Sequence, residues 1–435
     1  MRRTTELSLL FVAVVVIVST YVLASLGREA EIPANIFPFL GIIVALLIGA
    51  HIAVRRLAPM ADGVLLPIAG LLNGVGYVFI ARLDEDLAAN QAMWTAIGVA
   101  AFVATLLAVD KVRLLDSYRY TFMVIGIILL LLPLLPGLGQ TINGSRIWVS
   151  AGPFNFQPGE FAKIALAIFF AAYLVENREV LAMSTYRLGP FHLPEPKHLG
   201  PLLLAWGASV LVMTAEKDLG SSLLFFVLFV TMLWIATERG SYLVVSSLLF
   251  MGGATWAWMR FEHVQDRVDS WIDPWADASG SGYQVIQASF SLANGGVTGT
   301  GPGLGRPDLI PEVETDFIFA AVGEELGLFG ATAILVAFML IIGAGLRIAL
   351  TATQPFEKLL AAGITTLLGV QAFIIIGGVI RLLPLTGVTL PFVSYGGSSL
   401  LSNYILLALL LRISHESTAR QMAPAKSGPR AKTDA

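Results

Sequence analysis

Long runs of apolar residues alternate with short polar segments along almost the whole chain. A helix needs about 20 apolar residues to cross the hydrocarbon core of a bilayer. The pattern therefore predicts an all-α polytopic integral membrane protein with about 12 transmembrane helices. The expected spans lie near residues 7–26, 36–54, 63–81, 92–109, 120–137, 160–176, 199–215, 219–236, 241–259, 320–346, 358–380 and 389–412.

Composition supports the same class of protein. Of 435 residues, 56% are hydrophobic and 13% are charged, which is more apolar surface than a soluble domain can bury. The net charge of −3 gives no argument for a nucleic-acid partner, and the absence of cysteine excludes disulfides and thiolate metal sites. The apolar run at 7–26 is longer than that of a typical signal peptide, so we interpret it as a retained helix.

The basic residues of the short loops predict the orientation. Lysine and arginine concentrate on the cytoplasmic side of membrane proteins. With Met1–Arg3 inside, every second loop carries such bases, while the others hold isolated bases among acids. We therefore expect a multi-pass protein of the cytoplasmic membrane with both termini cytoplasmic. The inside bases are Arg55, Arg56, Lys111, Arg113, Arg119, Arg178, Arg187, Lys197, Arg239, Arg347, Lys358, Arg420, Lys426, Arg430 and Lys432.

One segment interrupts the apolar pattern for more than fifty residues. Residues 260–315 are polar, acidic and rich in glycine, and they precede the tenth span. This pattern predicts a large extracytoplasmic loop before the tenth helix. Its glycines do not match a dinucleotide-binding fingerprint, because Pro302 interrupts them and no βαβ pattern surrounds them. They indicate an irregular, mobile connection.

Charged residues at the edges of the apolar spans are the first candidates for chemistry. Glu160 and Lys163 are spaced i, i+3 and share one face of the sixth span. Charges in the hydrocarbon region are costly, so they indicate a functional or paired site. The alternative is a pair that only neutralises itself. Asp316 stands where the polar loop meets Phe317, and it is either a catalytic carboxylate or a helix-start residue that follows Thr315 as N-cap.

Other polar residues at the predicted outer face extend this set. Lys217 and Asp218 lie in a tight turn that is either solvated or lines one cavity together with Arg146 and Lys163. Two prolines and several hydroxylated residues at 390–399 indicate a helix broken at membrane depth, which is tolerated where the backbone lines a cavity or packs into protein.

Four motifs together resemble the SEDS family, the shape, elongation, division and sporulation proteins of the RodA and FtsW type. They are NGSRIWVSAGPFNFQPGEFAKIA, DPWADASGSGYQVIQASF, the segment Ile310–Asp316, and LPLTGVTLPFVSYGGSSLL. The resemblance implies a ten-helix core over residues 63–412 that polymerises peptidoglycan strands from lipid II with a class B penicillin-binding protein. Residues 1–62 would then be two additional helices. Proline, alanine and lysine in the last residues predict that residues 413–435 form a disordered cytoplasmic tail.

The resemblance also implies roles for single residues. The family's catalytic aspartate corresponds to Asp316, and its Gln-Pro-x-Glu-x-x-Lys motif places cavity residues at Gln157, Glu160 and Lys163. Together with the polar residues of the predicted outer face, the resemblance implies a substrate-binding site made of Arg146, Gln157, Glu160, Lys163, Lys217, Asp218, Glu325, Arg381, Ser394 and Ser398. Two positions depart from the family pattern. Lys217 stands where proline is common, and Arg381 stands where glycine is usual. Both changes add positive charge at the predicted outer face, where substrate phosphates would be held.

The resulting hypothesis is glycan transfer from an undecaprenyl diphosphate donor to a sugar hydroxyl, with Asp316 as the base and nearby cations stabilising the diphosphate. The sequence predicts no metal site, and dependence on a divalent cation is left open. A lipid-precursor flippase is the alternative, although the ionisable residues cluster at helix ends and no inverted repeat is evident. A third interpretation is a scaffold without chemistry, for which Asp316, Glu160 and Lys163 would be dispensable.

Overall fold

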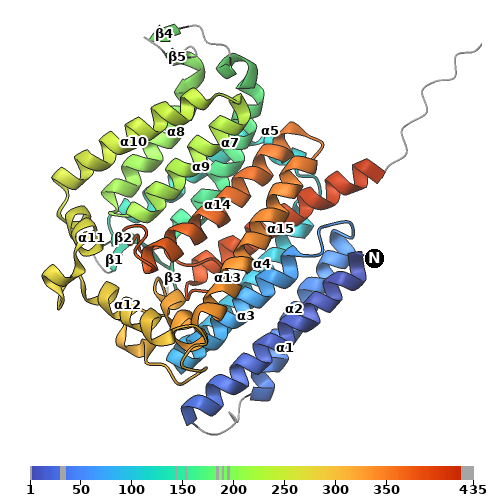
Figure 1. Cartoon of the computed structure of the whole chain (residues 1–435). Helices are drawn as coiled ribbons and strands as arrows, with labels where there is room; N and C mark the ends of the chain where they lie inside the picture. Colours follow the sequence, from blue (N-terminus) through green and yellow to red (C-terminus); the bar gives the residue numbers. More distant parts are fainter. Residues whose placement is uncertain are drawn as a thin grey trace, which may run out of the picture.

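The computed structural model describes residues 2–29, 36–142, 145–151, 154–182, 186–188, 191–193 and 196–422. It is a bundle of long helices (Figure 1). The long helices are α1 (Arg2–Glu29), α2 (Ile36–Leu57), α3 (Leu65–Leu83), α4 (Glu85–Ala108), α6 (Arg119–Leu131), α7 (Pro158–Ala182), α8 (Pro196–Ala215), α9 (Leu219–Thr237), α10 (Gly240–Arg260), α13 (Ile318–Thr351), α14 (Pro355–Val379) and α15 (Gly397–Met422).

Nine of these helices are, within the described residues, long and apolar enough to cross a membrane: α1, α3, α4, α7, α9, α10, α13, α14 and α15. Helices α2, α6 and α8 lie at the other three predicted positions. The polytopic all-α membrane class is confirmed, and the count of 12 spans stays a prediction. Helices α3, α7, α14 and α15 are mostly buried, whereas α1 and α10 are mostly exposed, as expected for helices that face lipid.

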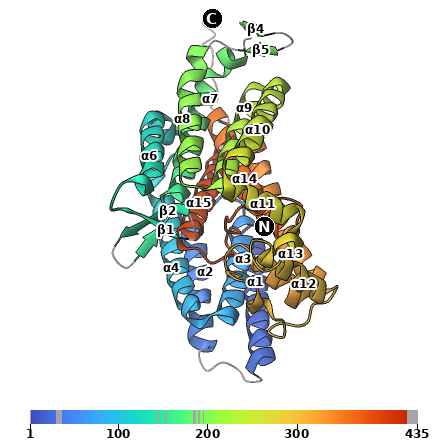
Figure 2. The same cartoon turned by 90° about the vertical axis from the view of Figure 1, so that its left-hand side faces the viewer.

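Shorter elements connect the long helices. Residues after α6 form a small antiparallel sheet of order β1-β2-β3, in which Val149 of the middle strand is paired with Gly139 on one side and Phe156 on the other. The sheet lies against η1, at the end of α6 (Figure 2). The short elements are α5 (Arg113–Ser117), η1 (Leu132–Leu134), β1 (Gly139–Ile142), β2 (Ser145–Ala151), β3 (Phe154–Phe156), β4 (Tyr186–Leu188), β5 (Phe191–Leu193), α11 (Glu262–Ile272), η2 (Pro274–Asp277), α12 (Tyr283–Gly295) and η3 (Pro307–Leu309).

The last predicted span is wrong at both ends. Its helix, α15, begins at Gly397 rather than near 389, because Pro391 lacks a backbone N–H and Phe392 has a positive φ of 65°. The helix also continues to Met422, into the predicted disordered tail, where Arg420 forms an ion pair of 2.6 Å with Glu357 of α14. The remaining residues of that predicted tail, 423–435, lie outside the described residues.

The glycine-rich connection packs tightly against α13, which is not what a mobile segment would do. Helix α13 is broken at Gly327, whose φ of 64° and ψ of −162° are non-helical. Backbone N–H groups of Thr300 and Gly301 donate to the carbonyls of Glu324 and Glu325, over 2.9 and 3.1 Å. A Cβ atom on Gly299 would lie 2.2 Å from the Glu325 carbonyl oxygen, so this close approach requires glycine.

The bundle has two distinct ends. At the end that carries the 261–317 loop, called the loop end, α1 and α3 finish while α4, α7, α13 and α15 begin (Figure 1). At the opposite end, called the tail end, Arg412 of α15 donates to the carbonyls of Leu57, Leu106 and Val109, over 2.7, 2.9 and 2.5 Å. Helix α1 packs along α3, and α2 packs against α4. The predicted boundary between residues 1–62 and the core stays a prediction.

Candidate active site

A buried ion pair stands at the start of α7. The Nζ atom of Lys163 lies 2.8 Å from Oε2 of Glu160, and the two side chains are 2% and 4% exposed. Each member has a further partner, because Lys163 donates to Gln371 Oε1 over 3.0 Å and Ser402 donates to Glu160 Oε2 over 2.7 Å. Buried ion pairs persist when such extra hydrogen bonds satisfy their remaining polar atoms. The pair therefore belongs to a network that joins α7, α14 and α15.

This network reaches the irregular segment before α15. Gln371 Nε2 donates to the Thr389 carbonyl over 2.8 Å, and Thr389 Oγ1 donates to Ser399 Oγ over 2.8 Å. The backbone N–H of Gln157 donates to Ser398 Oγ over 2.9 Å, so the start of α7 is fixed against the start of α15. These hydrogen bonds fix the segment 385–399 to α14 and to the start of α7. Its polar backbone thus packs against protein.

The same segment holds the backbone next to Asp316. Ser394 Oγ donates to the Thr315 carbonyl, and the backbone N–H of Tyr395 donates to the Glu314 carbonyl over 2.8 Å. Thr315 Oγ1 donates to Asp316 Oδ1 over 3.0 Å. The N-cap position of α13 is occupied by Phe317, so the interpretation of Thr315 as N-cap is wrong. Asp316 is instead a partly buried carboxylate just outside the first turn of α13.

Arg267 of α11 is the cation that acts on Asp316. Burial raises the pKa of Asp316 above its ordinary value, while the hydrogen bond from Thr315 and the charge of Arg267 oppose that rise. The guanidinium of Arg267 is itself fixed, because its Nη1 atom donates to the Leu385 carbonyl over 2.8 Å. Burial lowers the pKa of Arg267, and the carboxylates of Asp218 and Asp316 counteract this effect. The charges of one arginine and two carboxylates therefore influence one another.

Asp218 connects this arginine to the membrane-embedded pair. Its Oδ1 atom accepts a hydrogen bond of 2.9 Å from the backbone N–H of Ser221 and so caps the start of α9. Burial raises the pKa of Asp218, the bonds from Ser221 and the charge of Arg267 oppose this, and the charge of Glu160 adds to it. Asp218 is therefore within electrostatic reach of both Arg267 and Glu160.

Comparisons with known proteins show which family this chain belongs to. The family model for FtsW, RodA and SpoVE, described as "Cell cycle protein", matches residues 75–419. This chain belongs to that family. It is 45% identical over 443 residues to "Peptidoglycan glycosyltransferase RodA" of Mycobacterium tuberculosis (strain ATCC 25618 / H37Rv), with coverage of 99% of this chain and 94% of that protein. It is 36% identical over 303 residues to "Stage V sporulation protein E" of Bacillus subtilis (strain 168), with coverage of 69% and 80%.

Solved structures share the fold of this family member. One, described as "Structural coordination of polymerization and crosslinking by a peptidoglycan synthase complex", has a TM-score of 0.68 and 26% identity, with coverage of 82% of this chain and 98% of that chain. The rod shape determining protein RodA of Thermus thermophilus has a TM-score of 0.58 and 23% identity, with coverage of 82% and 97%. The second likeness bears on the fold alone.

Within the described residues, three of the predicted cations form no ion pair with Asp316. Arg381 Nη2 donates to the Trp271 carbonyl over 3.1 Å, and Trp271 Nε1 donates back to the Arg381 carbonyl over 3.0 Å. Arg381 thus holds the last turn of α11, the helix that carries Arg267. Arg146 Nη2 donates to the Leu135 carbonyl over 3.3 Å, and Lys217 is exposed in the outer turn.

Glu325 belongs to a different part of the loop end. It forms an ion pair of 2.5 Å with Arg82 of α3 and accepts a hydrogen bond of 2.8 Å from the Gly303 N–H. It therefore anchors the glycine-rich connection. Among the described residues, no three His, Asp or Glu side chains come together as a metal-ligand set.

Arg267 is the residue that the sequence reasoning missed. It stands among solvated carboxylates in the long polar loop, so nothing in its immediate neighbours marks it. The one signal was local: residues 262–272 form an amphipathic helix, of which Val264 and Ser270 are buried. An arginine on the turns between those two positions points toward protein rather than water.

Proposed function

We propose that this chain is a peptidoglycan glycosyltransferase that polymerises lipid II into glycan strands on the outer face of the cytoplasmic membrane. The observation that carries the proposal is Asp316, a partly buried carboxylate at the membrane boundary on which the charge of the partly buried Arg267 acts. The 45% identity to a named peptidoglycan glycosyltransferase over nearly the whole chain supports the same conclusion.

The raised pKa of Asp316 suits a general base. A sugar hydroxyl is a weak nucleophile near neutral pH, and a carboxylate whose pKa lies closer to the working pH accepts its proton more effectively. As the hydroxyl oxygen forms a bond to the anomeric carbon of the donor, Asp316 takes the hydroxyl proton. The bond between that carbon and the diphosphate oxygen breaks, and undecaprenyl diphosphate leaves with the electron pair.

Arg267 is placed to stabilise the leaving group. Negative charge grows on the diphosphate as the bond breaks, and a fixed guanidinium in a partly desolvated site stabilises such charge more than water does. The Leu385 carbonyl holds this guanidinium in position, and the charge of Asp218 acts on it. Arg381 contributes indirectly, because it fixes the end of the same helix.

The Glu160–Lys163 pair supports the site from within the membrane. Through Gln371 and Thr389 it fixes the 385–399 segment, and through Ser394 that segment fixes the backbone beside Asp316. We assign this pair a positioning role, together with a substrate-facing role for Lys163 when the diphosphate enters. A class B penicillin-binding protein is the proposed partner, because glycan strands must be crosslinked after polymerisation. Both termini are proposed to be cytoplasmic.

The decisive experiment is polymerisation of purified lipid II by the wild type and by Asp316→Asn, each with and without a class B penicillin-binding protein. Asparagine keeps the size of the side chain and removes the base. We expect glycan strands from the wild type and a rate at least about 10²-fold lower from Asp316→Asn. Asp308→Asn is the matched control, because Asp308 lies in the same loop on the exposed surface.

Equal polymerisation rates from Asp316→Asn and the wild type would exclude Asp316 as the general base. If no variant makes glycan strands and the protein transports lipid II across vesicle membranes, the glycosyltransferase proposal is wrong and the flippase hypothesis is supported.

A further inference from the structure

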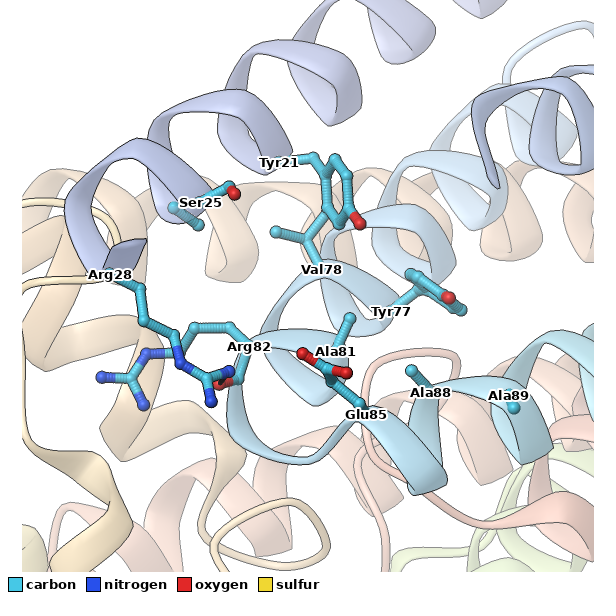
Figure 3. Close-up of a pocket in the computed structure, with 11 residues that line it drawn as sticks. Tyr21, Ser25, Arg28, Tyr77, Val78, Ala81, Arg82, Glu85, Ala88 and Ala89 are labelled. Carbon is cyan, nitrogen blue, oxygen red and sulfur yellow. Dashed lines mark hydrogen bonds between the residues drawn. The ribbon is translucent and has the colours of Figure 1, made fainter. Parts of the chain in front are cut away.

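A cavity of about 190 Å³ opens between α1, α3 and the first turns of α4 at the loop end (Figure 3). It lies beside α1, the first of the two N-terminal helices, rather than at the candidate active site, and Asp316 does not line it. Its polar lining residues are Tyr21, Ser25, Arg28, Tyr77, Arg82 and Glu85. The rest of the wall consists of small apolar side chains on the same three helices.

The charged side chains gather on one side of this cavity. Figure 3 shows the guanidinium groups of Arg28 and Arg82 close together with Glu85 beside them, while Tyr21 and Tyr77 lie on the other side. Both arginines are held in place. Arg28 Nη1 donates to the Arg82 carbonyl over 2.9 Å, and Arg82 Nη2 donates to the Gly305 carbonyl over 2.7 Å. Two fixed guanidinium groups offer the N–H geometry that phosphate oxygens accept.

The position and size of the cavity indicate what enters it. It lies where α1 and α3 end and α4 begins, which is the level of the lipid headgroups, and tyrosine is enriched at that level. Pockets for whole drug-sized ligands measure roughly 300–1,000 Å³, so this one fits a headgroup and leaves acyl chains outside. Leu23 and Leu26, on the same turns of α1, are exposed and offer an apolar surface for such chains.

The charges favour one class of headgroup. Arg82 forms an ion pair of 2.5 Å with Glu325, and Glu85 is the one carboxylate among the residues that line the cavity. A group with one phosphate for the guanidinium groups and one ammonium for Glu85 matches this lining, whereas a second negative charge would be repelled by Glu85. We propose that the cavity binds the headgroup of a zwitterionic phospholipid such as phosphatidylethanolamine, with its phosphate at Arg28 and Arg82 and its ammonium at Glu85.

Thermal unfolding of the lipid-depleted, full-length protein in detergent tests this site. A ligand that binds only the folded state raises the midpoint of unfolding as its concentration rises. We expect short-chain phosphatidylethanolamine to raise the midpoint of the wild type. The apparent affinity should fall about tenfold or more in Arg28→Gln, because a charge-assisted hydrogen bond is lost. Arg260→Gln removes the same charge from an exposed position at the same end and should behave as the wild type.

A second variant and two further ligands make the result decisive. Ala89→Leu fills the cavity from an exposed position of α4 without removing a polar group, and it should also weaken the response. Short-chain phosphatidylglycerol should bind more weakly than phosphatidylethanolamine, and Glu85→Gln should abolish that preference.

An unchanged response in Arg28→Gln and Ala89→Leu would exclude the cavity as the site. An equal shift with inorganic phosphate alone would assign it to a soluble anion, and equal binding of phosphatidylglycerol would reject the zwitterionic preference. Activity is not measured, so failure of the proposed enzyme would not affect these outcomes.

Discussion

At the scale of single residues, the candidate site is an electrostatic arrangement in which the charge of one arginine acts on two carboxylates. Asp316 and Asp218 are both partly buried, and burial alone would keep each of them protonated over a wider pH range. Arg267 opposes that effect at both positions. The strength of Asp316 as a base therefore depends on a residue far earlier in the sequence.

Replacing Arg267 with glutamine should lower the rate of lipid II polymerisation by about 10²–10³-fold, because a fixed charge at the leaving group is lost. The charge of Arg267 lowers the pKa of Asp316, so its removal raises that pKa. A base must be deprotonated to work, and the acid limb of the pH–rate profile should therefore move to higher pH. Polymerisation rates between about pH 5 and 9 measure both effects. Unchanged profiles in a folded Arg267→Gln protein would contradict this role.

Glu216 gives a separate prediction about stability. It is 4% exposed in the turn between α8 and α9, and burial, with a smaller effect of Asp218, raises its pKa from 4.5 to about 8. A raised folded-state pKa means that folding takes up a proton, so stability is greatest below the unfolded pKa and falls as pH rises through about 8. Glu216→Gln should equal the wild type near pH 5 and be more stable by about 1–3 kcal/mol near pH 9. Unfolding midpoints at the two pH values provide the comparison.

At the scale of elements, the break in α13 links the glycine-rich connection to the helix that follows Asp316. The connection donates N–H groups to the carbonyls of Glu324 and Glu325, and the helix resumes beyond Gly327. The early turns of α13 are therefore fixed by backbone contacts and by the ion pair between Arg82 and Glu325. This arrangement explains why so many glycines occur together in the loop.

Gly327→Ala should destabilise the protein by about 1–3 kcal/mol. Its φ of 64° disfavours an L side chain, and a Cβ atom would lie 2.2 Å from the backbone nitrogen of Gly299. Gly343→Ala is the matched control on the same helix, because a Cβ atom added there would meet no other atom within 4 Å. That change should be neutral or stabilise by up to about 1 kcal/mol. Thermal unfolding in one detergent compares the two variants, and equal midpoints would show that the break tolerates a side chain.

At the scale of the whole molecule, the two ends of the bundle have different roles, one in the candidate site and the other in stability. The loop end carries the candidate site, while the tail end is closed by charged side chains that bind helix ends. Arg412 joins α15 to the last turns of α2 and α4 through three carbonyl oxygens. Glu357, which is fully buried, binds Arg420 near the end of α15. These contacts attach the N-terminal helix pair and the C-terminal helix to one core.

Arg412→Met should destabilise the protein by about 3 kcal/mol or more, because hydrogen bonds from a charged group are worth about 1.5–3 kcal/mol each and buried carbonyls lose their donor. The polymerisation rate per folded molecule should stay close to that of the wild type, since Arg412 lies at the tail end. Arg113→Gln, an exposed change at the same end, serves as the control. Denaturation in a series of detergent mixtures and a lipid II assay measure the two properties. A large loss of rate in folded Arg412→Met would mean that the two ends are coupled.

The sequence by itself determined the membrane class, the approximate positions of the long helices and the family resemblance, because long apolar runs and local motifs are properties of neighbouring residues. It also predicted that Glu160 and Lys163 share a face, since an i, i+3 spacing is sufficient for that. Only the tertiary structure decided that the charge of Arg267 acts on Asp218 and Asp316, that Arg381 holds α11, and that Glu325 pairs with Arg82. Those contacts join residues far apart in the chain, and no local pattern specifies which distant helix end meets which loop.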